Sequence, residues 1–295
     1  MPELPEVEVV RAGLAPAATG ARVDAVRVLE ERSLRRHDGP SEDFVARLTG
    51  AVFDEPQRRG KFVWVPIAGS GEALMIHLGM SGQVLLRTPD AAVEKLTRIV
   101  LDITHPVQGR LRIDFVDQRI FGSMALDALV PAADEPGRLI PSQVAHIARD
   151  PMDPLFQDRA FLAALARRNT TIKRALLDQS LISGIGNIYA DEALWAARIH
   201  YDQPTRTLSR VRATTLLAEV RLVLGRALAE GGTSFDTQYL NVNGESGYFS
   251  HSLNAYGQTG LPCPRCGRPI VRESFMNRGS HFCAHCQRIR LGRGA

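Results

Sequence analysis

The C-terminal region contains two C-x2-C pairs, Cys263-Pro264-Arg265-Cys266 and Cys283-Ala284-His285-Cys286, with 16 residues between them. This spacing is typical of a four-thiolate zinc site. Because Zn2+ closes a tetrahedron with four thiolates, the pattern predicts one structural ion and a catalytic centre elsewhere in the chain. His281 and His285 are weaker candidates for ligands, since the two pairs already supply four sulfurs. The predicted metal ligands are Cys263, Cys266, Cys283 and Cys286.

Basic residues crowd the same region. The last 33 residues hold seven arginines and one acidic residue, Glu273. Such a tail indicates a polyanionic partner, although the charge alone fits a solvated basic terminus equally well. Residues 275–282 are predicted to form a β-hairpin with Arg278 at its turn, where the guanidinium can bind a phosphate through two hydrogen bonds.

Length and composition exclude several classes of protein. The chain has 295 residues, 44% of them apolar, and a net charge of +4, which predicts about two globular domains. No apolar run reaches the roughly 20 residues that span a bilayer. Glu3, Glu6, Glu8 and Asp24 interrupt the apolar stretch that a signal peptide requires. We therefore expect a cytoplasmic protein, whose cysteines bind metal rather than form disulfides.

The hydrophobic pattern changes along the chain. From Arg22 to about Leu126, short apolar runs alternate with Gly, Pro and polar turns, which predicts a β-rich domain. A helix near residues 5–14 is expected to precede this domain, and a helix at 41–48 to interrupt it. Prolines recur between residues 131 and 154, which is typical of a linker or an extended connection.

Helical spacing follows the prolines. The predicted helices are 159–168, 171–179, 187–197 and 209–229. The expected division of the chain is a first domain at 1–134, a linker at 135–157, a helical domain at 158–232, a loop and connection at 233–257, and the zinc module at 258–295.

Two glycines stand before the third of these helices, in the sequence Ser183-Gly184-Ile185-Gly186-Asn187. Glycines at a helix start expose backbone N–H groups that can bind a phosphate, and Asn187 is predicted to cap the helix while its side chain reaches outward. If this motif is considered alone, the simpler interpretation is that it forms a tight turn between two helices.

Two turn motifs in the first domain present apolar and basic side chains at strand ends. H-L-G-M-S-G at 77–82 contains Met80, and D-Q-R-I-F-G at 117–122 contains Arg119 and Phe121. An apolar wedge beside an arginine suits insertion into a stack of bases, whereas the alternative places Met80 and Phe121 in the core. Lys61, at the start of a predicted strand, is either a surface charge or a phosphate and catalytic contact.

The N-terminus begins Met1-Pro2-Glu3-Leu4-Pro5-Glu6. A small second residue permits removal of Met1, which leaves Pro2 with a free secondary amine whose pKa is roughly 8. A neutral amine can attack a carbonyl-like carbon and form an iminium, with a carboxylate alongside to move protons. The alternative is structural: the prolines stiffen the entry to a helix whose positive end favours acidic residues.

Together these motifs resemble the formamidopyrimidine-DNA glycosylases, bacterial base-excision enzymes that remove oxidised purines such as 8-oxoguanine. The resemblance covers nearly the whole chain. It is carried by P-E-L-P-E-V-E at the N-terminus, R-R-G-K-F around Lys61, H-L-G-M-S-G, D-Q-R-I-F-G, L-L-D-Q-S-L-I-S-G-I-G-N-I-Y-A-D-E around Asn187, and N-R-G-S-H-F-C-A-H-C in the zinc module. It implies an α+β fold of two domains: an N-terminal antiparallel β-sandwich flanked by helices, and a C-terminal helical domain with a helix-two-turn-helix and a four-cysteine zinc-finger β-hairpin.

The resemblance further implies a bifunctional glycosylase and AP lyase. Its partner is double-stranded DNA that contains an oxidised purine or an abasic site, in the bacterial cytoplasm at the nucleoid. A damaged nucleotide is flipped into a cleft between the domains, where the Pro2 nitrogen attacks the sugar C1′. Glu3 acts as acid and base with Glu6 in support, and β- and δ-elimination then cleave the strand. Lys61 contacts phosphate and assists elimination, and Arg278 contributes to the δ step.

The same resemblance assigns contacts with DNA. Asn187 and Arg278 match the phosphate clamp that flanks the extruded nucleotide. Met80, Arg119 and Phe121 match the triad that fills the vacated stack, and Arg119 faces the orphaned base, normally cytosine. The basic residues that fall near DNA-lining positions are Arg168 and Lys173. Zinc is expected to support DNA binding and to take no part in the chemistry.

Two positions depart from the family pattern. Leu96 stands where many members have a histidine that touches the DNA backbone, and Ile120 stands where some relatives have arginine or threonine. The loop that closes over the lesion is expected within residues 233–256, without assigned base contacts. A monomer is expected.

Two rival interpretations stay open at this point. The endonuclease VIII branch of the same superfamily shares the chemistry but prefers oxidised pyrimidines. It typically begins P-E-G-P-E, so Leu4 and the R-I-F pattern at 119–121 favour the purine branch here. The other rival is a non-catalytic zinc-finger protein that binds damaged DNA, which the intact Pro2, Glu3 and Lys61 disfavour.

Overall fold

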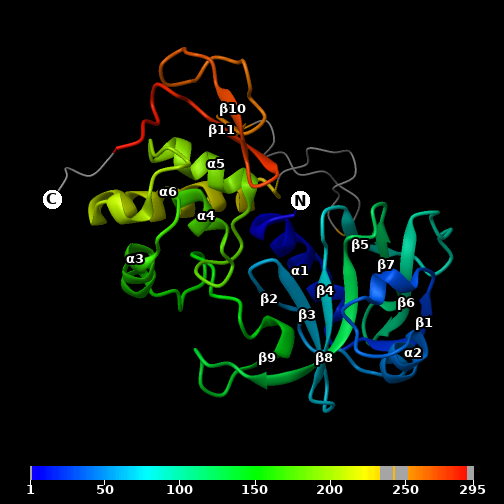
Figure 1. The fold of residues 1–295 in the computed structure, drawn as a ribbon. Coiled ribbons are helices and arrows are strands. Elements are labelled where there is room, and N and C mark those ends of the chain that lie inside the picture. The colour runs from blue at the N-terminus through cyan, green and yellow to red at the C-terminus, as the bar shows by residue number, and fades with distance from the viewer. Residues whose placement is uncertain (1, 233–241, 243–251, 291–295) are drawn as a thin grey trace. The chain divides into compact units, whose positions relative to one another are not determined.

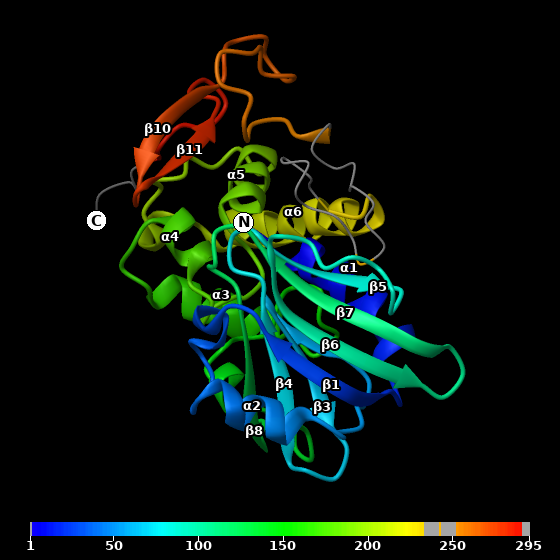
Figure 2. The same ribbon diagram turned by 90° about the vertical axis from the view of Figure 1, so that its right-hand side faces the viewer.

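The structure of the chain, a computed structural model, describes residues 2–232, 242 and 252–290 (Figures 1 and 2). Contacts divide the chain into two compact units. The first comprises residues 1–146 with 231–247, and the second comprises residues 147–230 with 248–295. Most of the loop expected at 233–256 lies outside the described residues.

The first unit is built on two antiparallel sheets. One sheet has the strand order β1-β6-β7-β5 and the other has the order β2-β3-β4-β8-β9. The strands are β1 (Arg22–Val28), β2 (Gln57–Arg59), β3 (Phe62–Ile67), β4 (Glu72–His77), β5 (Gly82–Arg87), β6 (Thr97–His105), β7 (Gly109–Asp117), β8 (Ser123–Pro131) and β9 (Leu139–Pro141). The helical segments are α1 (Leu4–Ala18), η1 (Glu31–Leu34), α2 (Ser41–Leu48) and η2 (Ser142–Val144). The expected β-sandwich with flanking helices is therefore confirmed.

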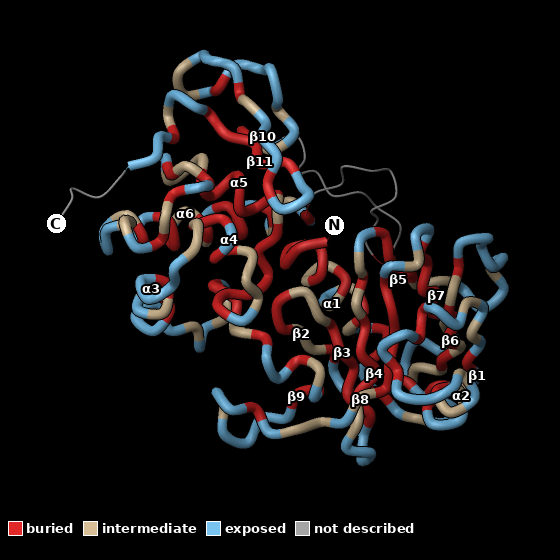
Figure 3. Tube along the Cα trace, in the orientation of Figure 1, coloured by how far each residue is buried: buried red, intermediate tan, exposed pale blue. Residues whose placement is uncertain are grey.

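One hydrophobic core joins the two sheets and the first helix. It contains Val10 of α1, Ile99 of β6, Val63 of β3 and Ile76 of β4. Val63 and Ile76 face each other across the β3–β4 ladder, and both strands are buried over most of their length (Figure 3). Burial of branched aliphatic side chains on paired strands is the main driving force for such a sandwich.

Helix α1 starts earlier and ends later than its hydrophobic pattern predicts. Glu3 is its N-cap and forms a reciprocal capping box with Glu6, whose Oε2 accepts a hydrogen bond from the Glu3 N–H at 2.8 Å. A proline in the first turn loses no helical hydrogen bond, which explains the tolerance of Pro5. The N-terminal motif therefore forms the start of a helix, as the structural interpretation of its prolines predicts.

The predicted linker at 135–157 is partly wrong. Within it, β9 pairs with β8 in the five-stranded sheet, and η2 follows directly. Proline is disfavoured in the central strands of a sheet but is tolerated in an edge strand. Pro141 is the last residue of β9, which lies at the edge of its sheet.

The second unit is helical and ends in a β-hairpin. Its elements are α3 (Asp158–Arg167), α4 (Ile172–Leu177), α5 (Asn187–Ala196), η3 (Thr205–Thr207), α6 (Arg210–Ala229), β10 (Val271–Phe275) and β11 (Arg278–Phe282). All four predicted helices are present, with ends that differ by at most two residues. Met276 and Asn277 have φ of 47° and 59°, which is the left-handed pair that a two-residue hairpin turn requires. Arg278 is thus the first residue of β11 rather than a turn residue.

Among the described residues, no helix is both long and apolar enough to cross a membrane.

Candidate active site and nucleic-acid interface

The start of α1 places Pro2 directly before two buried acidic residues, Glu3 and Glu6. Pro2 directly precedes the N-cap Glu3, and the side chains of Glu3 and Glu6 are only 1% and 3% exposed. Gly232 lies against Glu6: a Cβ built on it would be 3.0 Å from Glu6 Oε1, and its φ of +85° is itself unfavourable for other residues.

Lys61 is placed by a two-residue turn between β2 and β3. Gly60 takes a φ of +57° in this turn. Arg58 fixes the turn to the first helix, because its Nε donates to Glu8 Oε2 at 2.8 Å and its Nη1 donates to the Gly60 carbonyl at 3.0 Å. Burial raises the pKa of Glu8, but hydrogen bonds from Arg11 and Arg58 outweigh burial and lower that pKa overall. An ionised Glu8 therefore ties the Lys61 turn to α1.

His77 belongs to this region, although the sequence pattern showed it only as part of a motif. Its Nδ1 accepts a hydrogen bond from the Gly79 N–H at 3.2 Å. Burial, together with the positive charges of Arg36, Arg35 and Lys61, lowers the pKa of His77 to about 4. The imidazole is neutral at physiological pH amid three cations, an environment that favours an anionic ligand.

The two turn motifs present their side chains together. Met80 follows β4 and is 37% exposed, and Phe121 follows β7 and is 40% exposed. The guanidinium carbon of Arg119 lies 4.8 Å from the centre of the Phe121 ring. Because a Cβ on Gly79 would come within 2.3 Å of the Phe121 backbone, the turns touch and only glycine fits there. The alternative that buries Met80 and Phe121 in the core is wrong.

Asn187 opens α5 in the second unit, but it is not the cap. Gly186 is the N-cap and Asn187 is the first helical residue, so the predicted capping role is wrong. Its Nδ2 instead donates to the Gly279 carbonyl of β11 at 3.0 Å. Its Oδ1 is buried, and no described residue donates a hydrogen bond to it. Arg278, the neighbour of Gly279, is exposed and is paired with Phe275 in the β10–β11 ladder.

Lys173 does not line a surface, so the expectation that it contacts DNA is wrong. It is fully buried, and its Nζ lies 2.6 Å from Asp191 Oδ1 of α5. Asp191 also accepts a hydrogen bond from the His281 N–H at 2.8 Å, and Lys173 donates to Ser280 Oγ at 2.7 Å. A buried charge requires such partners. Because Asp191 and Lys173 also bind His281 and Ser280 of β11, the ion pair fixes the zinc hairpin to α5. Arg168 is exposed and pairs with Asp178 at 3.0 Å.

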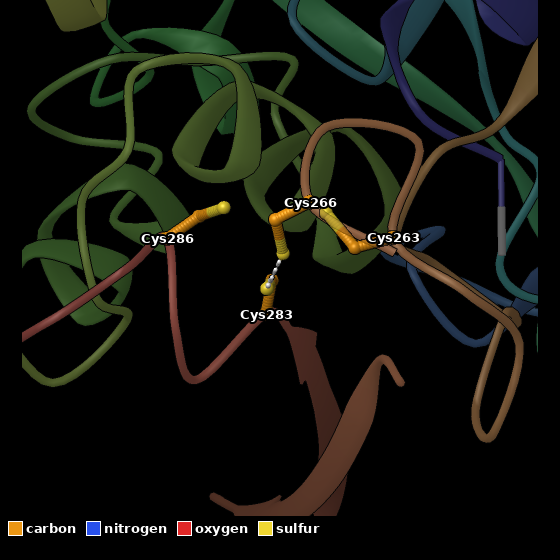
Figure 4. Close-up of side chains that lie close together, drawn as sticks. All are labelled: Cys263, Cys266, Cys283 and Cys286. Carbon is orange, nitrogen blue, oxygen red and sulfur yellow. Dashed lines mark hydrogen bonds between the residues drawn. The ribbon is translucent and has the colours of Figure 1, made fainter. Parts of the chain in front are cut away.

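The four cysteines gather as their spacing predicts. Their Sγ atoms all lie within 4.8 Å of one another (Figure 4). Four thiolates at about 2.3 Å from one Zn2+ would be about 3.8 Å apart, so the donor set fits this ion. The histidines are occupied otherwise: His281 contacts Asp191, and His285 Nδ1 lies 2.9 Å from an Arg268 nitrogen.

Trp195 contacts the cysteine cluster from outside the set of metal ligands. Trp195 of α5 donates from Nε1 to Cys263 Sγ at 3.5 Å. Its ring also stacks under the Arg265 guanidinium, with the carbon 3.9 Å from the ring centre. Such N–H···S contacts orient a ligand and disperse its charge. The zinc module is therefore anchored to the same helix that carries Asn187.

The chain combines a β-sandwich, whose first helix follows Pro2 and has two buried glutamates at its start, with a helical unit that carries a four-cysteine hairpin. These features define the class of DNA glycosylases with a helix-two-turn-helix and a zinc finger. Family models match in order along the chain: the formamidopyrimidine-DNA glycosylase N-terminal domain at residues 1–124, the formamidopyrimidine-DNA glycosylase H2TH domain at 147–239, and a zinc finger found in FPG and IleRS at 260–289. The chain belongs to the formamidopyrimidine-DNA glycosylase family.

Individual relatives agree with this assignment. The chain is 64% identical to a formamidopyrimidine-DNA glycosylase of Leifsonia xyli subsp. xyli, over 98% of this chain and 100% of that protein. It is 55% identical to the enzyme of Thermobifida fusca, over 97% of each. Among solved structures, Lactococcus lactis Fpg in complex with DNA that contains an abasic site matches with a TM-score of 0.81 and 30% identity, over 97% of this chain and 99% of that one.

Proposed function

We propose that this chain removes oxidised purines from duplex DNA and then cuts the strand at the resulting abasic site, with the Pro2 amine as nucleophile. The observation that carries the proposal is the place of Pro2, directly before the positive end of α1, whose first turn holds the buried residues Glu3 and Glu6. Lys61, Arg35 and Arg36, whose positive charges surround His77, form a basic region on the same unit that suits the DNA backbone.

In the proposed reaction, the lone pair of the Pro2 nitrogen forms a bond to the sugar C1′ while the bond between C1′ and the damaged base breaks. The base leaves with the electron pair of that bond and takes up a proton, and the Pro2 nitrogen gives up its own N–H proton. Glu3 donates a proton to the ring oxygen, which opens the sugar and leaves an iminium between Pro2 and C1′. The iminium acidifies the C2′ proton. Loss of that proton expels the 3′ phosphate, and a second elimination, assisted by Lys61 and Arg278, expels the 5′ phosphate.

Other residues act on the DNA around the lesion. Met80, Arg119 and Phe121 fill the space that the flipped nucleotide leaves, with Arg119 toward the orphaned base. Asn187 and Arg278 hold phosphate. Zn2+ stabilises the hairpin that carries Arg278 and supplies no reactive group. We further place the enzyme at the nucleoid in the bacterial cytoplasm, where both its substrate and reduced thiolates occur.

Lesion preference tests this function against its pyrimidine-specific rival. Duplexes with 8-oxoguanine opposite cytosine should be cut faster than duplexes with thymine glycol opposite adenine, because the chain carries the R-I-F wedge at 119–121 and Leu4. Single-turnover excision rates on both duplexes give the comparison. Faster cleavage of thymine glycol would contradict the proposal, and binding without cleavage of either would support the non-catalytic alternative.

A second prediction concerns the phosphate contact of Arg278. The variant Arg278→Ala should bind damaged duplex more weakly, and the slope of log affinity against log salt should fall in magnitude by about 1, because one fewer phosphate is neutralised. Titrations between about 50 and 200 mM salt measure this slope. Arg159→Ala, which removes an exposed arginine of α3, is the matched control. Equal slopes for Arg278→Ala and the unmodified chain would exclude the contact.

A further inference from the structure

A buried carboxylate joins the two turns that carry Met80, Arg119 and Phe121. Asp117, the last residue of β7, is fully buried. Its Oδ1 accepts a hydrogen bond from Ser81 Oγ at 2.5 Å and one from the Arg119 N–H at 3.1 Å. Its Oδ2 accepts from the Gly122 N–H at 2.6 Å. One side chain thus binds the turn that contains Met80 and both ends of the segment 119–122.

The middle of that segment is strained. Ile120 has a φ of +55°, a left-handed conformation that β-branched residues rarely adopt. The Arg35 guanidinium holds it from outside, since it donates to the carbonyl of Ile120 at 2.9 Å and to that of Phe121. A strained residue persists only when its surroundings fix it, and such residues concentrate at functional sites. The surroundings here are Asp117 and Arg35.

The geometry points to Asp117 as a positioning residue for the DNA wedge: its carboxylate holds Ile120 in the left-handed conformation, so that Arg119 and Phe121 stand beside Met80 before DNA arrives. This inference rests on the proposed function, because it assigns a role to residues that fill the vacated base stack. Asp117 touches no reacting atom. Its loss should impair base flipping and recognition of the orphaned base, and should leave the chemistry of Pro2 intact.

The isosteric variant Asp117→Asn separates these effects. The amide oxygen can replace Oδ1 and keep both of its donors, but the amide N–H2 then faces the Gly122 N–H, donor against donor. The Gly122 end of the segment is released while volume is unchanged. Asp114→Asn is the matched control: it lies on the same strand, is equally buried, and pairs with Arg112 rather than with either turn.

The test compares two substrates. On duplex DNA with 8-oxoguanine opposite cytosine, Asp117→Asn should excise the base about tenfold more slowly, since release of the strained turn adds a cost of this order to wedge insertion. On single-stranded DNA with an abasic site, which has no orphaned base and needs no wedge, borohydride trapping should match that of the unmodified chain. Fluorescence of a 2-aminopurine beside the lesion should report slower insertion.

The outcomes are distinct. Equal losses on both substrates would mean a general structural role, and unchanged rates on both would mean that the turns hold their shape without Asp117; either overturns the inference. Absent single-strand trapping in the unmodified chain would refute the proposed Pro2 chemistry instead. If Asp117→Asn fails to fold, Ser81→Ala, which removes one donor to the same carboxylate, should show a smaller loss on duplex alone.

Discussion

A chain that keeps residues in front of Pro2 will bind abasic duplex DNA but will form no borohydride-stable adduct and will not cut the strand. A glutamate inserted between Met1 and Pro2 achieves this, because a large second residue prevents removal of Met1. The Pro2 nitrogen then lies in an amide, whose lone pair is delocalised and cannot attack C1′. Gel analysis of trapped and cleaved products, beside a binding titration, measures both properties.

The matched control is the unmodified chain, with mass spectrometry to show that Pro2 is its first residue. Because Glu3 and Glu6 already close the start of α1 through their capping box, the inserted residue should leave the helix and the fold unchanged. Strand cleavage by the extended chain at the normal rate would contradict the assignment of the nucleophile.

Loss of the zinc site is expected to weaken DNA binding strongly. In Cys283→Ser, the chain should lose its single zinc ion, and affinity for damaged duplex should fall by at least about a hundredfold, because the ion supplies most of the folding energy of such a module. Cys283 is buried and its Sγ lies 3.5 Å from that of Cys266. Metal analysis and titration of a fluorescent duplex measure the two effects.

His285→Ala is the matched control for the cysteine variant. His285 stands between two ligands in the sequence but contacts Arg268 and Arg288, so the variant should keep one zinc ion and near-normal affinity. If Cys283→Ser retains full affinity after zinc is lost, the hairpin is held by Asp191 and Lys173 alone, and the metal is not needed for binding.

Much of the fold follows from local patterns in the sequence. Alternating apolar residues identified the β-rich unit, helical periodicity identified α3 to α6, and the spacing of the cysteines identified their cluster. The failures have a common cause. β9 lies in a proline-rich stretch and forms only because β8 offers a free edge, and Asn187 turns its side chain to Gly279 of a strand about 90 residues away. Local propensity contains no information on such distant partners.

The site residues divide in the same way. The sequence motifs predicted Met80, Arg119 and Phe121 as site residues, but they did not predict a role for the Asp117 carboxylate, which holds the two turns. Asp117 was visible as the first letter of its motif, and only the structure shows that it binds both turns. Lys173 was expected at a DNA-lining surface because the family resemblance placed it near such basic residues, but it is buried. Its buried partner, Asp191, comes from a different helix and could not be paired with it by spacing.

The most direct test of the central claim is to locate the covalent bond. The protein is mixed with abasic duplex DNA, reduced with borohydride and digested, and the modified peptide is sequenced by mass spectrometry. We predict that the sugar remnant is attached to the nitrogen of an N-terminal Pro2. Attachment to Lys61, or to any other side chain, would contradict the account.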